Sequence, residues 1–281
     1  MTNHYLMAEQ ITAFLCYLKR EERSSGTIEK YLRDVRAYSA WLDGRPGTRD
    51  TAVQWKEQLL VKGYAPVTVN SMLAAINSFF RFAGWDECRV KFLKIQRRMF
   101  REQAKELTRA EYAALLDAAR ALDRERLALL MEAICATGIR VSEVQYLTVE
   151  AARQGRTEIS LKGKIRTILL PGKLCRKLLN YAKKHGISAG RIFLTKRGRS
   201  LSRRQIWAEM KGLCAKAGVA PSKVFPHNLR HLFASVFYQA SKDIARLADV
   251  LGHSSIETTR IYLLTTGGEH MRQLDNLGFV S

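Results

Sequence analysis

Apolar residues in the first part of the chain recur at helical spacing in four stretches that turn-forming residues separate. The first stripe covers residues 11–18. The second covers residues 28–42, and Ser25 or Thr27 can cap the start of its helix through a side-chain oxygen. An Arg-Pro-Gly turn at residues 45–47 then ends the pattern.

Two further stripes follow this turn. A weaker one spans residues 51–61, and a stronger one begins at Pro66 or Val67 and continues in register to Ala83. Aromatic residues recur on the apolar faces, where we expect them to pack in a core. Four helices of this length predict a small all-α domain over residues 1–90.

Charge replaces the apolar pattern over residues 91–106. A segment of this kind is expected to be a solvated, flexible linker between two domains. A basic linker can also lie along a nucleic-acid backbone, where each cation adds a salt-dependent phosphate contact, and the two roles are compatible. The positive residues are Lys91, Lys94, Arg97, Arg98, Arg101 and Lys105.

The chain from residue 107 onward predicts a second, mostly helical domain. One of its helices ends at Gly138 and Ser142 can cap the next, so Arg140 lies in the tight turn between them. A guanidinium in such a bend lies beside helix N-terminal amides, which also favour anions.

The clearest β signal comes from two short runs, residues 157–161 and 166–170, joined by a Lys-Gly-Lys-Ile turn at residues 162–165. They predict an antiparallel hairpin with lysine at its tip, where Lys164 is expected to contact DNA. A helix over residues 173–184 follows, and a dense basic segment leads into a helix over residues 202–217. Such a segment most simply contacts phosphates. Its basic residues are Lys196, Arg197, Arg199, Arg203 and Arg204.

The most reactive side chains lie between residues 226 and 262. His227 and Arg230 are three residues apart, so they share one face of a predicted helix. His253 follows a predicted helix end, and Tyr262 is expected about two turns into the next helix. Two imidazoles, a guanidinium and a phenol on neighbouring helices of a basic chain indicate chemistry on a phosphodiester.

Glycine and a capping box separate the helices of this stretch. Gly252 suits the left-handed conformation of a helix C-cap, and Ser254 with Glu257 predicts the start of the following helix. His231 is expected to pack within the fold rather than to take part in chemistry.

Composition and charge narrow the class of binding partner. The chain has 47 Lys and Arg residues against 26 Asp and Glu residues, a formal net charge of +21, and 47% of its residues are hydrophobic. This is a folded protein whose surface attracts polyanions, of which nucleic acid is the common one. The sequence holds no transmembrane run and no signal peptide. We therefore expect a cytoplasmic protein with no membrane partner.

Cysteine and histidine usage predicts no metal centre. The five cysteines form no C-x-x-C pair and fit neither a disulfide framework nor a zinc site. His227 and His231 have a spacing that some zinc sites use, but no carboxylate or cysteine stands near them in the sequence.

Five motifs resemble those of the tyrosine recombinase (phage integrase) family, and they occur along the chain in the order that the family shows. The step of nine residues from the last histidine to the tyrosine also matches, and the resemblance covers nearly the whole chain, best over residues 107–265. The hairpin turn is one residue shorter than usual, and Leu232 replaces a small hydroxyl residue. The motifs are Thr137-Gly-Ile-Arg140-Val-Ser-Glu143, Lys162-Gly-Lys-Ile-Arg166, His227-Asn-Leu-Arg230-His231, Leu251-Gly-His253 and Tyr262.

The resemblance implies a mainly α fold in three parts. These are a four-helix, SAM-like core-binding domain (1–90), a basic linker (91–106), and a mostly helical catalytic domain with a small antiparallel hairpin (107–281). Family members act on double-stranded DNA sites as homotetramers holding two duplexes, in some cases with accessory DNA-bending proteins. They exchange strands without a metal, ATP or another cofactor, and pass C-terminal segments between neighbours.

The resemblance also implies the central roles in catalysis. Arg140 and Arg230 would clamp the scissile phosphate, because a guanidinium stays ionised and grips phosphate bidentately. Tyr262 would attack the phosphorus, forming a 3′-phosphotyrosyl intermediate and releasing a 5′-hydroxyl.

Four further residues would support this reaction. Lys162, preferred over Lys164, would protonate the leaving 5′-oxygen. His227 would act as general acid and base, and His253 would donate a hydrogen bond to the phosphate. Glu143 would support the catalytic residues without itself contacting the phosphate.

Two other functions remain open at this point. A type IB topoisomerase would use a similar site to nick and reseal DNA, and a catalytically silent protein would only bind or shape it. Each candidate residue alone also has an ordinary structural role, and only their combination favours a recombinase. The DNA target and the choice between integration, excision, inversion and dimer resolution are not encoded in these motifs.

Overall fold

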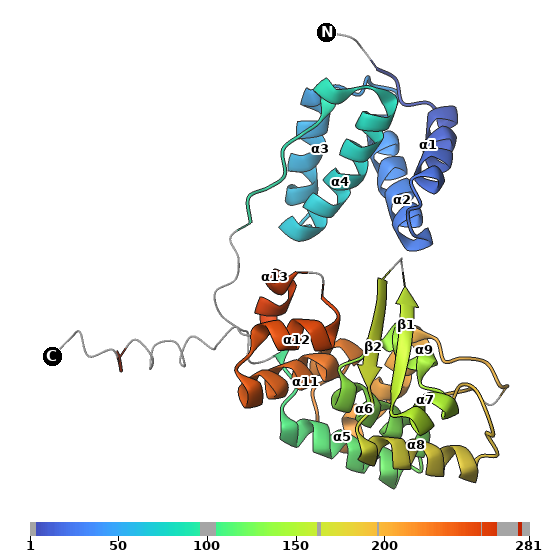
Figure 1. Cartoon of the computed structure of the whole chain (residues 1–281). Coiled ribbons are helices and arrows are strands. Elements are labelled where there is room, and N and C mark those ends of the chain that lie inside the picture. Colours follow the sequence, from blue (N-terminus) through green and yellow to red (C-terminus); the bar gives the residue numbers. More distant parts are fainter. Residues whose placement is uncertain are drawn as a thin grey trace. The chain divides into compact units, whose positions relative to one another are not determined.

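The computed structural model describes most of the chain and divides it into two compact units, residues 1–97 and 98–281 (Figure 1). Within the described part, no helix is long and apolar enough to cross a membrane. The described residues are 4–95, 105–161, 164–195, 197–253, 255–262 and 275–276.

The first unit is a bundle of four helices with an aromatic core. Phe14, Tyr38 and Phe79 are fully buried at its centre. Ser24 caps the second helix by accepting a hydrogen bond from the backbone N–H of Thr27, so the cap lies one residue before the predicted pair. The helices are α1 (Ala8–Arg20), α2 (Ser25–Leu42), α3 (Arg49–Val61) and α4 (Pro66–Ala83), followed by the short 3-10 helix η1 (Asp86–Cys88).

Two asparagines on α4 hold the chain that leaves this bundle. Asn77 exchanges two hydrogen bonds with the backbone of Val90, at 2.9 and 3.0 Å. Asn70 makes the same pair with the backbone of Leu93, at 2.9 and 2.7 Å. The predicted flexible linker therefore begins with residues that are fixed to α4.

The second unit is mostly helical and carries one two-stranded sheet (Figure 1). Its helices are α5 (Arg109–Ala121), α6 (Glu125–Thr137), α7 (Val149–Gln154), α8 (Gly172–Lys184), α9 (Arg203–Lys211), α10 (Cys214–Ala217), α11 (Pro226–Ser241), α12 (Ile244–Leu251) and α13 (Ile256–Thr259). The 3-10 helices η3 (Val141–Tyr146), η4 (Pro221–Lys223) and η5 (Arg260–Tyr262) complete it.

Both strands of the hairpin are one residue longer than the sequence predicts. Strands β1 (Arg156–Leu161) and β2 (Lys164–Leu169) pair antiparallel, with Leu161 opposite Lys164. Lys164 and Ile165, which were predicted in the turn, therefore belong to β2.

The helix predicted over residues 202–217 is broken into α9 and α10. The break falls at Gly212 and Leu213, because glycine is a poor helix former.

The core of the second unit forms around α6. Leu130, Met131 and Ile134 on this helix are fully buried, and α11 packs against it. A smaller apolar cluster between α11, α12 and η5 includes Leu247 and Tyr262. This packing brings the end of α6, the face of α11 and the end of α12 together.

Candidate active site

Five of the six predicted catalytic residues come from these converging elements. Arg140 follows α6, and both His227 and Arg230 lie on α11. His253 follows the end of α12 and Tyr262 lies in η5. The sixth, Lys162, falls outside the described residues, between Leu161 and Lys164 of the hairpin.

Arg230 is the centre of the cluster and is only 2% exposed. Its guanidinium donates to the carbonyl oxygens of Gly138 at 2.5 Å and Leu251 at 2.8 Å, and Nη2 also contacts His253 Nε2 at 2.9 Å. A further hydrogen bond joins it to the side chain of Tyr262. Burial, and then the neighbouring charge of Arg140, lower the pKa of Arg230 to about 10. The side chain therefore stays cationic at neutral pH in a fixed orientation.

Arg140 is anchored at one end and open at the other. Its backbone N–H donates to Glu143 Oε2 at 2.7 Å, and Nη1 pairs with Glu143 Oε1 at 3.0 Å. Its side chain remains 42% exposed, whereas that of Glu143 is 2% exposed. The expected cap at Ser142 is wrong, because Glu143 binds the backbone of Arg140 at the start of η3.

Gly138 makes the close approach of these elements possible. Its φ of +65° is left-handed, and an added Cβ would lie 2.4 Å from the ring of Phe233 on α11. Its carbonyl oxygen is also one of the two that hold Arg230. Any larger residue here would separate the turn from α11.

The hydrogen bonds of His253 define its protonation. A guanidinium only donates, so Nε2 of His253 accepts from Arg230, and Nδ1 then donates to Thr259 Oγ1 at 2.8 Å. Burial, followed by the charges of Arg230 and Arg140, lowers the pKa of His253 to about 4. Burial and the same arginines lower the pKa of His227. Both imidazoles are therefore neutral near pH 7.

Tyr262 is packed tightly between two histidines. Its ring stacks on His253, with centroids 6.0 Å apart and an angle of 13°, and meets the ring of His231 edge-on at 4.8 Å. The side chain is 3% exposed. The phenol thus points to the guanidinium of Arg230 rather than to solvent.

The start of the last helix differs from the prediction. Ser255 is the described N-cap and accepts from the backbone N–H of Glu257 at 3.2 Å, whereas Ser254 falls outside the described residues. Helix α13 lasts only one turn, and Tyr262 ends a separate 3-10 turn.

The cluster includes a residue that sequence reasoning missed, Arg166. His231 was expected to pack within the fold, and its ring packs against that of Tyr262. Arg166 on β2 reaches the cluster through Glu143 and the carbonyl of Leu251. Its place in the Lys162–Arg166 motif was the available signal.

The predicted DNA-contacting residues are only partly gathered at this cluster. Arg203 and Arg204 of α9 line a cavity of about 640 Å³ beside it. Trp207 and Phe225 add apolar walls, and the other lining residues are Ile139, Arg140, Val141, Ser142, Pro226, His227 and Arg230.

The remaining predicted contacts lie elsewhere or outside the description. Arg197 and Arg199 line a separate cavity of about 520 Å³. Lys94 is exposed in the first unit and Lys164 begins β2. Arg97, Arg98 and Lys196 fall outside the described residues.

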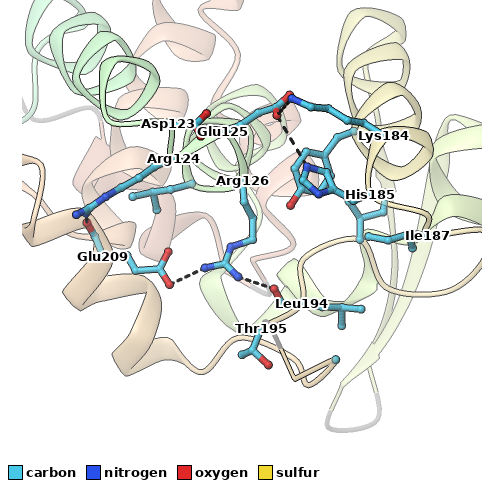
Figure 2. A pocket seen from close by; sticks show the side chains of 14 residues that line it. Asp123, Arg124, Glu125, Arg126, Lys184, His185, Ile187, Leu194, Thr195 and Glu209 are labelled. Atoms are coloured by element: carbon cyan, nitrogen blue, oxygen red, sulfur yellow. Dashed lines mark hydrogen bonds and ion pairs between the residues drawn. The ribbon is translucent and has the colours of Figure 1, made fainter.

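The largest of the cavities found among the described residues is not lined by any predicted catalytic residue. It measures about 1010 Å³ and lies at the start of α6 and the end of α8 (Figure 2). Its charges pair with one another, Arg126 with Glu209 at 2.8 Å and Lys184 with Glu125 at 2.6 Å. These pairs brace α6 against α8 and α9, so size alone does not identify the functional site.

One group among the described residues has donors suited to a metal ion. His4, Glu87 and Cys88 bring their ligand atoms within 4.8 Å of one another in the first unit. His4 Nε2 is bonded to Glu87 at 2.5 Å, and the Cys88 thiol donates to the carbonyl of Gly47 at 3.3 Å. Burial raises the pKa of Cys88 to about 11, so its thiol stays protonated at neutral pH, and His4 and Glu87 are already bonded to each other.

Comparisons with known proteins match both units. A family model described as "Phage integrase family" matches residues 105–266, and one described as "Phage integrase, N-terminal SAM-like domain" matches residues 11–87. The chain belongs to the phage integrase family. This tyrosine recombinase is 32% identical to "Tyrosine recombinase XerA" of Thermococcus kodakarensis, over 94% of the chain and 93% of that protein.

A second relative and a solved structure agree with this family assignment. "Tyrosine recombinase XerC" of Roseiflexus castenholzii is 31% identical over 91% of the chain and 88% of that protein. A crystal structure of a lambda integrase dimer bound to a COC′ core site has the same fold, with a TM-score of 0.73 at 17% identity, covering 91% and 94% of the two chains.

These findings confirm the predicted family and the predicted fold class. They also confirm that the recombinase is a site-specific enzyme that cleaves and rejoins DNA, and they do not favour the topoisomerase and silent-binder alternatives. The domain boundaries and the roles of the individual residues stay predictions.

Proposed function

We propose that Tyr262 attacks a DNA phosphodiester that is held by Arg140 and Arg230, and so forms a covalent 3′-phosphotyrosyl intermediate. The observation that carries this proposal is the hydrogen bond between the Tyr262 side chain and the guanidinium of Arg230. It puts a nucleophile next to a fixed cation in a basic protein. The covalent bond keeps the energy of the phosphodiester, so a second 5′-hydroxyl reverses the step without ATP.

The two arginines have complementary parts in holding the phosphate. Arg230 is fixed by carbonyl oxygens and supplies a rigid donor. Arg140 is 42% exposed and its Nη2 makes only a long contact, 3.5 Å to the carbonyl oxygen of Gly252, which a non-bridging phosphate oxygen can replace. Positioned donors of this kind stabilise the charge that develops in the transition state, and loss of one typically slows a reaction by about 10²–10³-fold.

The histidines are suited to proton transfer rather than to neutralising the charge of the phosphate. His227 is neutral near pH 7, so it can accept the phenolic proton as a general base. His253 accepts from Arg230 through Nε2 in the free protein. It can donate to a phosphate oxygen once its proton moves from Nδ1 to Nε2, with the Thr259 hydroxyl then donating to Nδ1. Lys162 would protonate the leaving 5′-oxygen.

The DNA contacts are inferred from charge around the same cluster. Arg203 and Arg204 line the cavity beside the proposed phosphate site, where they can bind neighbouring phosphates. Solved structures of similar fold include a Tn1549 transposon integrase in complex with transposon right end DNA, at a TM-score of 0.71 and 16% identity. Double-stranded DNA is therefore the proposed substrate, and a mobile element is its proposed source.

We further propose that the active assembly is a homotetramer on two duplexes, as in a structure of a lambda integrase tetramer bound to a Holliday junction. An apolar groove of about 500 Å³ on α5, α6 and α11 is available for a neighbouring subunit's C-terminal segment. Leu232, which departs from the family pattern, lines this groove with Val236.

The proposal is tested by trapping the covalent intermediate on a nicked suicide substrate. Tyr262→Phe should abolish the adduct and leave DNA affinity within about threefold, because only the hydroxyl is lost. Tyr238→Phe on α11 is the matched control and should form the adduct normally. An adduct that persists in Tyr262→Phe would show that another residue is the nucleophile.

A further inference from the structure

Arg166 binds two other members of the cluster but has no assigned role. It projects from β2 and is 15% exposed. Its Nη2 pairs with Glu143 Oε2 and its Nη1 donates to the carbonyl oxygen of Leu251. The guanidinium thereby joins the hairpin to η3 and to the end of α12.

The turn after α12 is shaped around this side chain. Gly252 has a φ of +63°, and an added Cβ would lie 2.4 Å from Cδ of Arg166. The glycine therefore gives the turn its left-handed conformation and also leaves space for the guanidinium. A solvated arginine without a fixed place would not need such space.

Arg166 shares a partner with each of the two proposed phosphate-binding arginines. Glu143 pairs with the guanidinium of Arg140 through Oε1 and with that of Arg166 through Oε2, which also accepts from the backbone N–H of Arg140. The carbonyl oxygen of Leu251 accepts from Arg166 Nη1 and also from Arg230 Nη2. A change at Arg166 therefore alters the hydrogen bonding of both arginines, because each of them shares an acceptor with Arg166.

The charges explain why a third arginine is useful here. Glu143 is a buried carboxylate, and paired with Arg140 alone it would form a neutral pair that holds Arg140 back from a ligand. With Arg166 on its second oxygen, the three groups carry one net positive charge. The exposed end of Arg140 then remains available to an anion.

We propose that Arg166 is a positioning residue that balances the charge of Glu143, so that Arg140 can bind the scissile phosphate. Arg166 acts through Glu143 and the Leu251 carbonyl and does not itself touch DNA. This inference rests on the proposed function of the cluster. The pKa of Arg166, which burial lowers most, is partly restored by Glu143, in accord with a tight pair.

The decisive experiment removes the two opposing charges one after the other. Arg166→Gln should slow adduct formation on the suicide substrate by about 10²-fold, comparable to losing a transition-state donor. DNA affinity should change less than about threefold, because Arg166 is largely buried. Glu143→Gln added to this variant should then recover at least about tenfold of the rate, because Arg140 is no longer neutralised.

A purely structural brace would behave differently. Removing both members of a brace leaves the double variant as slow as Arg166→Gln or slower, and that result would overturn the proposal. So would an Arg166→Gln enzyme that cleaves within about threefold of the original. Arg156→Gln, an exposed arginine at the base of the same hairpin, is the matched control and should retain the rate.

Two further measurements keep the test decisive. If Arg166→Gln fails to fold, as judged by thermal unfolding, Arg166→Lys retains the charge and should cleave within about tenfold of the original; a loss beyond about 10²-fold contradicts the proposal. Tyr262→Phe in the original background must abolish the adduct. Should it not, the proposed function fails, whatever Arg166 does.

Discussion

At the scale of single residues, the protonation of His253 follows from the guanidinium groups around it. Burial and the charges of three arginines lower its pKa from 6.5 to about 4 in the folded protein. In the unfolded chain the imidazole returns to its ordinary pKa. The unfolded state therefore takes up a proton first as the pH falls.

This difference predicts a pH dependence of stability. The free energy of unfolding of the second unit should be at its full value above about pH 6.5 and should decrease as the pH falls from 6.5 towards 4. His253→Gln should make this part of the profile flatter. Urea unfolding read by hydrogen exchange of second-unit amides measures both profiles, and identical slopes in the two proteins would contradict the assigned pKa.

The sequence predicted which residues meet but not how they bind. Arg140, His227, Arg230, His253 and Tyr262 could be chosen because their types and order match a phosphoryl-transfer site. Their hydrogen bonds could not, because the main acceptors are carbonyl oxygens, and main-chain atoms leave no trace in residue identity. For the same reason, the role of His253 as an acceptor became visible only in the structure.

At the scale of elements, the two asparagines of α4 fix the chain that leaves the first unit. Asn77→Ala should destabilise this unit by about 1–3 kcal/mol, because the N–H and C=O of buried Val90 lose their partners. Asn70→Ala should cost less, because water can replace its bonds at half-buried Leu93. Equal losses in urea unfolding would argue against burial as the cause.

The hairpin register separates its two candidate lysines. Lys164 is paired within β2, whereas Lys162 lies outside the described residues. Lys162→Ala should slow cleavage of ordinary DNA by about 10²-fold or more but leave cleavage of a 5′-bridging phosphorothiolate nearly unchanged, because sulfur departs without a proton. Lys164→Ala is the control. The assignment is reversed if Lys164→Ala shows this pattern.

Helix existence was predictable from apolar periodicity, whereas boundaries were not. The four stripes of the first unit gave its four helices, but the caps at Ser24 and Ser255 lay one residue away from the predicted ones. Neighbouring serines and threonines have the same capping chemistry, and only the path of the chain selects one of them. The fixed start of the linker was missed because a single asparagine gives no periodic signal.

At the scale of the whole molecule, the net charge of +21 predicts DNA binding that weakens steeply with salt. Arg203→Ala should reduce the slope of log affinity against log salt by about 1 if this residue binds one phosphate. Lys184→Ala, whose ammonium pairs with Glu125, should leave the slope unchanged. Fluorescence anisotropy at several salt concentrations measures both, and parallel lines for original and Arg203→Ala proteins would remove Arg203 from the interface.

The division into two units follows from where apolar residues are dense. Each unit has a core of its own, around Phe14 and Phe79 in the first and around α6 in the second. Domain count was therefore predictable from composition along the chain. The arrangement of charged pairs around the largest cavity was not, because ion pairs such as Arg126–Glu209 join residues far apart in sequence.

The carbonyl oxygen of Leu251 receives two guanidinium groups. No amino-acid replacement at that position deletes a main-chain oxygen, so the central acceptor is immune to point mutation. Apolar residues of similar volume at this buried position should therefore keep the cleavage chemistry intact. Neighbouring Gly252 offers no such freedom.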